Sequence, residues 1–325
     1  MSADVAVLSD PGASAPVEFD HGDLDTAPTP TPESGWWVQR FTTGAIIVAP
    51  FAALAVLVSG VLDDGLAWWN FALAALFYVV VAHGVTIGFH RLFTHRSFEA
   101  RRPLKIALAV AGSLSFQGSI IGWVAEHRRH HMYTDKPRDP HSPVRPATQR
   151  FGRTRGFFHA HAGWFFTPTG TTREQYAPDL LADRDIVAVD RLFVPLCIVT
   201  LAAPFLIVFT ITGNWEAGVA ALLMAGLVRV GLLHHVTWST NSVCHMFGTR
   251  PFRTTDVSTN FAPLAVLSMG ESWHNAHHAF PAMARHGVDP GQLDTSAMTI
   301  RLFERLGWVS QVRWPEPARL ALRRR

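Results

Sequence analysis

The sequence predicts an all-α protein that crosses a membrane four times. Hydrophobic residues make up 48% of its 325 residues and charged residues only 16%. Four apolar stretches are each long enough to cross roughly 30 Å of hydrocarbon as a helix. Histidines, 17 in all, gather in the polar segments that border these stretches. We therefore expect a polytopic membrane protein with two helical hairpins and a cytoplasmic helical cap that holds a metal site.

The chain divides into three parts by composition. Residues 1–35 are rich in Asp, Pro, Ser, Thr and Gly and show no apolar period, which is typical of a disordered tail. Residues 36–310 hold the apolar stretches and the histidine-rich segments, and we interpret them as one membrane domain. Residues 311–325 carry two prolines and end in three arginines, which indicates a basic C-terminal tail.

The first two apolar stretches, 45–62 and 66–89, are joined by an acidic linker, 63–65. This linker contains no Lys or Arg, whereas several arginines follow residue 89. Because cytoplasmic loops carry the excess of Lys and Arg, we expect the linker outside and His90 at the cytoplasmic surface.

A third apolar stretch, 104–123, is interrupted by glycine, serine and glutamine. If it crossed the membrane, the histidines before and after it would lie on opposite faces and could not share one site. We therefore expect an interfacial or re-entrant segment that packs against protein.

The second hairpin follows a polar cap segment, 126–190. Its apolar stretches, 192–211 and 217–233, flank a short turn without Lys or Arg, so Asn241 and His245 return to the cytoplasmic side. Arg229 is costly in lipid, and we expect it to snorkel or to face protein. Both termini then lie on the cytoplasmic side, and a bacterial plasma membrane fits this arrangement.

The histidine spacing predicts a metal site. An H-x-x-H-H pattern occurs twice, and because positions i, i+3 and i+4 share one face of a helix, each copy presents three imidazoles together. His90 and His95, five residues apart, would lie about 140° apart on an ideal helix, so we expect the helix to end between them. The candidate ligands are His90, His95, His127, His130, His131, His245, His274, His277 and His278.

Nine imidazoles exceed the three or four that one tetrahedral zinc ion needs, so two metal ions are predicted. Imidazole-rich, open coordination at a membrane suits iron that activates dioxygen. Asn241, one helical turn from His245, can hold a metal-bound water. Glu126 and Glu271, which lie beside two of the histidine groups, can each orient a ligand imidazole or form a simple surface ion pair.

The two cysteines support neither a disulfide framework nor a thiolate metal site. No Cys set for an iron–sulfur cluster and no G-x-G-x-x-G unit is present. Electrons are therefore expected from a separate ferredoxin- or cytochrome-type donor with its NAD(P)H reductase. A basic face toward one side of a lipid bilayer explains the pI of about 9.2 without a nucleic-acid partner.

Four motifs, HRLFTHRSF, EHRRHH, NSVCHMFGTRPF and GESWHNAHHAFP, resemble the histidine boxes of the integral-membrane fatty acyl desaturases, most closely the stearoyl-CoA delta-9 type. The resemblance implies a cap that holds a di-iron centre, with two iron ions bound by the nine histidines and a water on Asn241. It also implies a kinked acyl tunnel bounded by Gln117, Trp123, Thr237 and Trp238.

The implied activity is oxygen-dependent desaturation of a saturated long-chain acyl-CoA, with a cis double bond at the delta-9 position. The sequence departs from the animal enzymes of this type where they carry a basic pair facing the coenzyme A phosphates, because residues 165–169 are uncharged. Arg128, Arg129, Arg153 and Arg155 remain as candidate phosphate contacts. The alternatives are a phospholipid-linked substrate, a histidine-box lipid or alkane hydroxylase and, in a different class, a membrane metal transporter.

Overall fold

The computed structural model describes residues 36–60, 67–144, 152–167 and 170–325. The expected disordered tail, 1–35, and the linker 63–65 lie outside the described residues. Most of the described chain is helical, as the sequence predicts. The elements in chain order are α1 (Trp36–Ser59), α2 (Trp68–His83), η2 (Gly84–Thr94), β1 (Glu99–Ala100), α3 (Arg102–Ser113), α4 (Ile120–Tyr133), α5 (Arg153–His161), η3 (Gly163–Phe166), α6 (Arg173–Tyr176), α7 (Pro178–Ala182), α8 (Arg184–Arg191), α9 (Phe193–Thr212), α10 (Trp215–Ala221), η4 (Leu222–Val228), α11 (Arg229–Ser242), η5 (Val243–His245), η6 (Ala262–Leu264), α12 (His274–Ala279), α13 (Thr295–Arg305), β2 (Val309–Ser310) and α14 (Pro317–Arg323).

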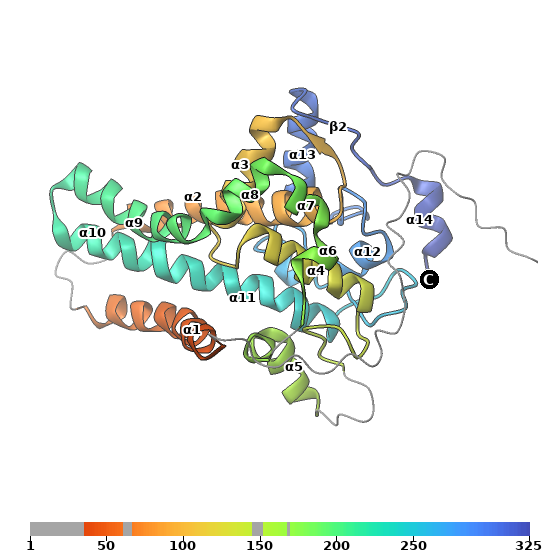
Figure 1. Ribbon diagram of the computed structural model, residues 1–325, viewed down its shortest axis with the longest axis horizontal. Coiled ribbons are helices and arrows are strands. Elements are labelled where there is room, and N and C mark those ends of the chain that lie inside the picture. The colour runs from red at the N-terminus through yellow and green to blue at the C-terminus, as the bar shows by residue number, and fades with distance from the viewer. Residues whose placement is uncertain (1–35, 61–66, 145–151, 168–169) are drawn as a thin grey trace, which may run out of the picture.

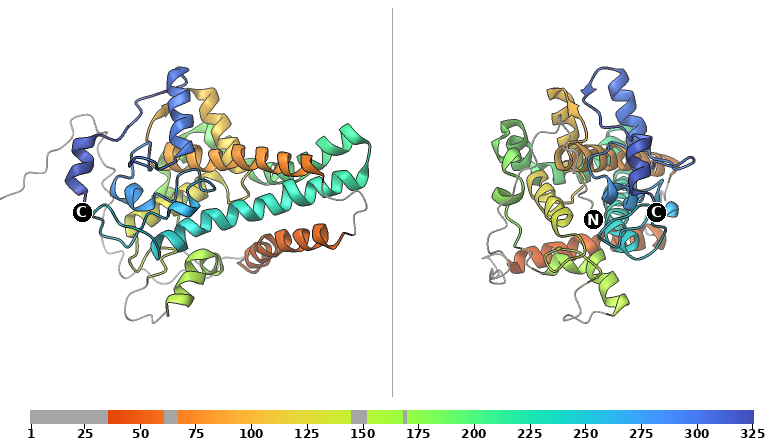
Figure 2. Two further views of the ribbon diagram at one scale, coloured as in Figure 1. Left: turned by 180° about the vertical axis from the view of Figure 1, so that it is seen from behind. Right: turned by 90° about the vertical axis from the view of Figure 1, so that its right-hand side faces the viewer.

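Within the described residues, four helices are long and apolar enough to cross a membrane, which agrees with the predicted number of spans. They run over Arg40–Ser59, Trp68–Thr94, Phe193–Thr212 and Trp215–His245. The second and fourth spans lie side by side along the long axis of the molecule, and α1 packs against η4 and α11 of the fourth span (Figures 1 and 2). Arg229 is buried and bonds to the backbone carbonyls of Ala225 and Thr200, so it faces protein.

The interrupted stretch 104–123 forms two helices, α3 and α4, neither of which is long enough to cross a bilayer. α3 packs closely on η2, and the close approach depends on Gly84. A Cβ at Gly84 would lie 2.3 Å from the carbonyl carbon of Ala111. Small residues at such positions let helix backbones approach each other, so this contact holds the second span against α3.

The C-terminal segment lies against the histidine-bearing region rather than apart from it. β1 and β2 pair antiparallel, with Glu99 opposite Ser310. The backbone nitrogen of Arg253 donates to the carbonyl of Arg323, and the Arg323 guanidinium donates to the carbonyl of Ala279 at the end of α12. α14 and α12 thus lie at the end of the molecule opposite the connection between α9 and α10 (Figure 1).

Candidate metal centre

The structure brings all nine predicted histidines into two clusters. In each cluster, the ring nitrogens that could bind a metal lie within 4.8 Å of one another. The first cluster has five histidines and the second has four. They are His90, His95, His127, His131 and His277 in the first, and His130, His245, His274 and His278 in the second.

Each H-x-x-H-H helix contributes to both clusters. In α4, His127 and His131 belong to the five-histidine cluster, whereas His130 between them belongs to the four-histidine cluster. α12 divides its histidines the opposite way, because His274 and His278 enter the smaller cluster and His277 the larger. Each cluster thus contains the first and last histidines of one H-x-x-H-H motif and the middle histidine of the other motif.

His90 and His95 converge for a reason that the sequence did not indicate. The helix ends at Thr94, between the two residues as expected, but its last eleven residues have π-helical winding. Its hydrogen bonds join residues i and i+5, and the backbone nitrogen of His95 donates to the carbonyl of His90 at 3.1 Å. The wider turn therefore brings the two rings, whose centroids lie 4.7 Å apart, to one side of the helix.

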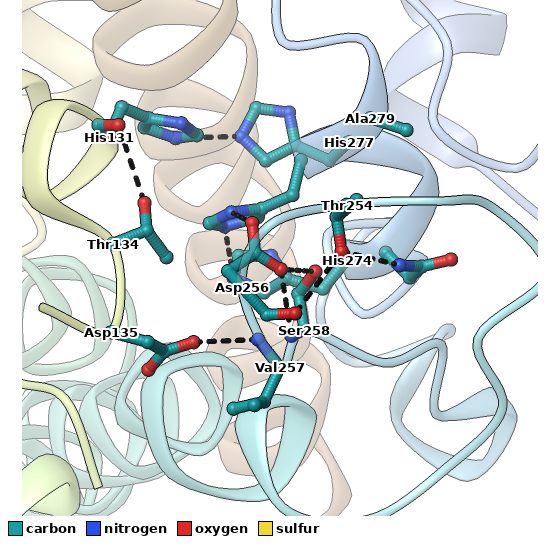
Figure 3. A network of polar contacts seen from close by, with 12 residues as sticks. His131, Thr134, Asp135, Thr254, Asp256, Val257, Ser258, His274, His277 and Ala279 are labelled. Atoms are coloured by element: carbon teal, nitrogen blue, oxygen red, sulfur yellow. Dashed lines mark hydrogen bonds and ion pairs between the residues drawn. The ribbon is translucent and has the colours of Figure 1, made fainter. Parts of the chain in front are cut away.

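Carboxylates orient the imidazoles from outside the clusters. Nδ1 of His130 lies 3.0 Å from Asp139, Nδ1 of His245 lies 3.0 Å from Asp135, and Nδ1 of His278 lies 3.0 Å from Asp256. Backbone and side-chain groups fix these carboxylates in turn: Ser258 donates to Asp256, and the backbone nitrogen of Val257 donates to Asp135 (Figure 3). With a proton on Nδ1, each ring presents the lone pair of Nε2 to its cluster.

The facing lone pairs fit a metal ion. His245 and His278 both place the Nδ1 proton on a carboxylate, so their Nε2 atoms are acceptors. Nε2 of His274 lies 3.1 Å from the first and 3.0 Å from the second, and it cannot bond well to both. Nε2 of His95 and Nε2 of His130 are buried and have no hydrogen-bond partner among the described residues. A cation bound between these nitrogens would satisfy all of the lone pairs.

Burial favours the neutral, metal-binding form of several of the rings. Burial, together with the neighbouring histidines, lowers the pKa of His131, His277 and His278 well below the usual value. Burial alone would raise the pKa of Asp139, but the adjacent His130 lowers it to about 2. Neutral imidazoles and an ionised carboxylate are the protonation states that metal binding requires.

A second buried network, which the sequence analysis missed except for Glu271, supports the larger cluster. Oε2 of Glu271 lies 2.6 Å from Nδ1 of His90 and 3.2 Å from Nδ1 of His286. Oε1 of Glu271 accepts from the guanidinium of Arg91, which is fully buried and also pairs with Asp294 at 3.0 Å. The burial alone would raise the pKa of Glu271, but His90, His286 and Arg91 lower it well below its usual value.

The partners of the histidines differ in how well the sequence could have indicated them. Asp135 and Asp139 follow the second histidine box within eight residues, so their proximity in sequence could have indicated their role. Asp256 and His286 reach the clusters through loops without a motif. Glu126, the other acidic candidate, instead accepts a hydrogen bond from Thr171 at 2.8 Å.

A cavity of about 750 Å³ reaches the metal centre from between the helices. Gln117, Trp123, Thr237 and Trp238 all line it, and so do His90, His127, His274 and Asn241. The Gln117 amide donates to the Thr237 hydroxyl at 3.0 Å, and the Trp123 ring stacks on that of His127 with centroids 5.0 Å apart. Trp123 thus packs against a candidate ligand imidazole at the cavity wall.

The expected phosphate contact at Arg128 is wrong, because its guanidinium is used inside the fold. It bonds to Asp179 and to the backbone carbonyls of Phe93 and Tyr176. Phe165, in the uncharged stretch, lines the large cavity and stacks on Trp164 with ring centroids 4.0 Å apart. These two positions therefore offer packing rather than anion binding.

Comparison with known proteins gives consistent similarities. Residues 66–290 match the family model described as fatty acid desaturase. The chain is 38% identical over 234 residues to a hex-5-enoyl-[acyl-carrier protein] acetylenase of Moorena producens, covering 71% of this chain and 73% of the relative. It is 34% identical over 284 residues to an acyl-CoA C20 delta-5 desaturase of Anemone leveillei, covering 86% and 85%. It is 32% identical over 293 residues to an sn-1 stearoyl-lipid 9-desaturase of Anabaena variabilis, covering 89% and 98%.

Proposed function

Because the chain belongs to the fatty acid desaturase family, we propose that it introduces a cis double bond, at the delta-9 position, into a saturated long-chain acyl group. The reaction converts a CH2–CH2 unit, O2, two electrons and two protons into CH=CH and two waters. Two bound iron ions would supply the oxidising power that takes hydrogen from the two carbons. The protein's residues bind the ions, position the chain and exclude water.

One observation carries this proposal: the large cavity is bounded by imidazoles of both clusters. His90 and His127 belong to the five-histidine cluster, and His274 belongs to the other. The remaining wall is mainly apolar, with Ile46, Val85 and other side chains of the spans. An acyl chain held there would have its methylenes beside both metal sites, and the volume lies in the range of small-molecule sites.

The nearest ring nitrogens in the clusters have the spacing of neighbouring ligands on one metal ion. Two nitrogens that each lie about 2.1 Å from one ion are about 3.0 Å apart at a right angle and about 3.4 Å apart at a tetrahedral angle. The five Nε2 to Nε2 contacts within the clusters are all 3.0 or 3.1 Å. We assign iron from the chemistry of the donor set, because imidazole-rich sites with an open position suit iron that activates dioxygen.

The two sites would then differ by one ligand. The four-histidine cluster has one ligand fewer, and Asn241 lines the same cavity as His274 of that cluster. We assign the Asn241 amide to a water that completes this site. Gln117, Trp123, Thr237 and Trp238 would form the bend of the acyl tunnel, with the bond between Gln117 and Thr237 fixing its shape.

Acyl-CoA remains our proposed carrier, with a membrane lipid as the second candidate. The relatives named above act on three different carriers. A lipid is the second candidate because Thr42 of α1 and Val194 of α9 line the cavity while exposed on two candidate membrane spans. A chain attached to a bilayer lipid could enter between these helices.

The reducing electrons would come from a separate ferredoxin- or cytochrome-type protein and its NAD(P)H reductase. The only two cysteines, Cys197 and Cys244, are both buried and unpaired. We place the metal centre on the cytoplasmic side of a bacterial plasma membrane, which agrees with the distribution of Lys and Arg.

Product analysis of the reconstituted enzyme tests the proposal. Labelled stearoyl-CoA and labelled phospholipid are supplied separately, with acyl exchange blocked, dioxygen present and a donor system added. We expect an alkene that requires dioxygen, about two irons per chain, and loss of both iron and alkene in His130→Ala. An alcohol as the product would indicate a hydroxylase instead, and an alkene formed only in the phospholipid would replace the proposed carrier.

A further inference from the structure

A second, smaller cavity reaches the metal centre at histidines that do not line the large cavity, which we call the acyl cavity because it is the proposed site of the acyl chain. Its volume is about 160 Å³, and it is lined by His131, Met132, Thr134, Lys136, Thr255, Asp256, His278 and Pro281. His131 belongs to the five-histidine cluster and His278 to the other. Neither of them lines the large cavity. The small cavity, in turn, is not lined by His90, His127 or His274.

This pocket brings solvent close to both clusters at once. The His131 and His278 rings are stacked, with centroids 4.7 Å apart and planes 27° apart. Lys136 and Thr255, which line the same pocket, are exposed. Nε2 of His131 also lies 3.0 Å from Nε2 of His277, so the pocket leads directly to the nitrogens of the larger cluster (Figure 3). Electrons that arrive here have a short path to either site.

Three basic side chains come from the lining of this pocket or from segments next to it, and we call Lys136, Arg253 and Arg323 the basic rim. Lys136 lines the pocket, and Arg253 lies two residues before Thr255. Arg323 donates to the carbonyl of Ala279, which follows His278, and its guanidinium lies 5.6 Å from the centroid of the Phe280 ring.

The positive charge of the basic rim is available to a partner. All three side chains are exposed, and within the described ranges none of them forms an ion pair. The one carboxylate that lines the pocket, Asp256, is already bonded to His278 and Ser258. Arg324, by contrast, pairs with Asp289.

We propose that the basic rim and the adjoining pocket are the docking site for the reductant, a small acidic protein that carries one electron at a time. This inference rests on the proposed function, because desaturation needs two electrons per turnover and hence two successive encounters. In each encounter the carrier is oxidised by one electron and the metal centre is reduced by one. Weak electron-transfer complexes are small, and complementary charge raises their rate of association.

The acyl cavity is the less suitable entry for a reductant. Its walls are mainly apolar and it is filled by the acyl chain during turnover, whereas the pocket is polar at its mouth and lies outside that path. His278, which lines the pocket, belongs to α12, and α12 and α14 lie at the end of the molecule away from the connection between α9 and α10 (Figure 1).

Charge reversal with a matched control tests the docking site. Lys136→Glu combined with Arg253→Glu changes the net charge by the same amount as Arg184→Glu combined with Arg305→Glu, which alters exposed residues of α8 and α13. The probe is an acidic [2Fe–2S] ferredoxin with its reductase. At low salt we expect the first variant to lose at least 10-fold in kcat/KM for ferredoxin, with a smaller loss at high salt, and the control to stay near wild type.

A chemical reductant separates docking from catalysis. Each protein is reduced with dithionite without oxygen, and dioxygen is then added in the presence of the acyl substrate. We expect the same single-turnover yield of alkene from both variants and wild type. If wild type itself forms no alkene here, the proposed function fails, whatever the docking result.

A blocking label provides a test that changes no charge of the basic rim. The native cysteines are buried, so Thr255→Cys can be labelled selectively with a bulky maleimide, with labelled Ser310→Cys as the control. We expect the label at position 255 alone to suppress electron transfer from ferredoxin. Equal ferredoxin kinetics in each variant and its control would overturn the proposal, as would a rise confined to the KM of the acyl substrate, which would assign the rim to an anionic substrate headgroup.

Discussion

Glu271→Gln is the sharpest single test of how the larger histidine cluster is held. Glu271 lies 2.6 Å from Nδ1 of His90, and its other oxygen accepts from Arg91. In the variant, the amide oxygen can keep the bond to Arg91, but the amide nitrogen then faces His90 as a donor. His90 would have to accept at Nδ1 and move its proton to Nε2, the nitrogen aimed at His277. The ring would thereby lose its ligand lone pair.

The expected loss of metal affinity can be taken from the role of Glu271, which orients the His90 imidazole. Replacing a group that orients a ligand imidazole typically costs 10- to 100-fold in metal affinity, or about 1.4 to 2.7 kcal/mol. Arg91 keeps its ion pair with Asp294 at 3.0 Å, so its buried charge is not left alone. We therefore expect weaker binding of one metal ion rather than loss of the fold.

Metal titration of the purified protein, followed by thermal unfolding of the metal-free form, measures both quantities. The control is Glu304→Gln, because Glu304 pairs with Arg301 at a partly exposed site and should contribute less than about 1 kcal/mol. Two metal ions bound with wild-type affinity in Glu271→Gln would refute the tautomer argument.

Three further changes test packing, charge and the cavity. Gly84→Ala should lower the thermal midpoint by several degrees, because its Cβ meets backbone 2.3 Å away, whereas Gly44→Ala, with open space around it, should not. Burial alone would raise the pKa of Asp179, but its bonds to Arg128 and Arg96 lower it to about 2. Asp179→Asn should therefore lower the free energy of unfolding by about 2 kcal/mol at pH 7. The difference from wild type should disappear only as the pH falls from about 4 toward 2. Trp123→Ala removes the ring stacked on His127, and lipid mass spectrometry should show a mixture of double-bond positions; a single unchanged position would contradict this role.

The positions of the ligands could be predicted from the sequence because two of the motifs are short helices. The spacing of His127 to His131 and of His274 to His278 determines which rings share a face, whatever the rest of the fold does. The division of each motif between two clusters could not be predicted, since it depends on how α4 and α12 face each other. The π-helical winding at His90 was also outside the reach of a pattern based on 3.6 residues per turn.

The carboxylates that bond to the histidines also show that sequence spacing predicts local contacts but not contacts made by the tertiary fold. Asp139 lies nine residues after His130 and bonds to it, so local sequence holds that information. Asp256 lies 22 residues before His278, at the end of a segment with irregular structure, and only the tertiary fold brings them to 3.0 Å. Spacing rules identify partners within one helix, whereas contacts between a helix and a loop depend on packing that no single motif encodes.

The separation of the two cavities bears on the order of events. His90, His127 and His274 meet the acyl cavity, whereas His131 and His278 meet the small pocket. Because no imidazole lines both, an acyl chain bound in the first cavity as proposed would leave the second open. A buried centre must exclude water from the reacting carbons and still accept electrons from outside. Approach from two sides meets both requirements, since the centre can be reduced while the substrate is already in place.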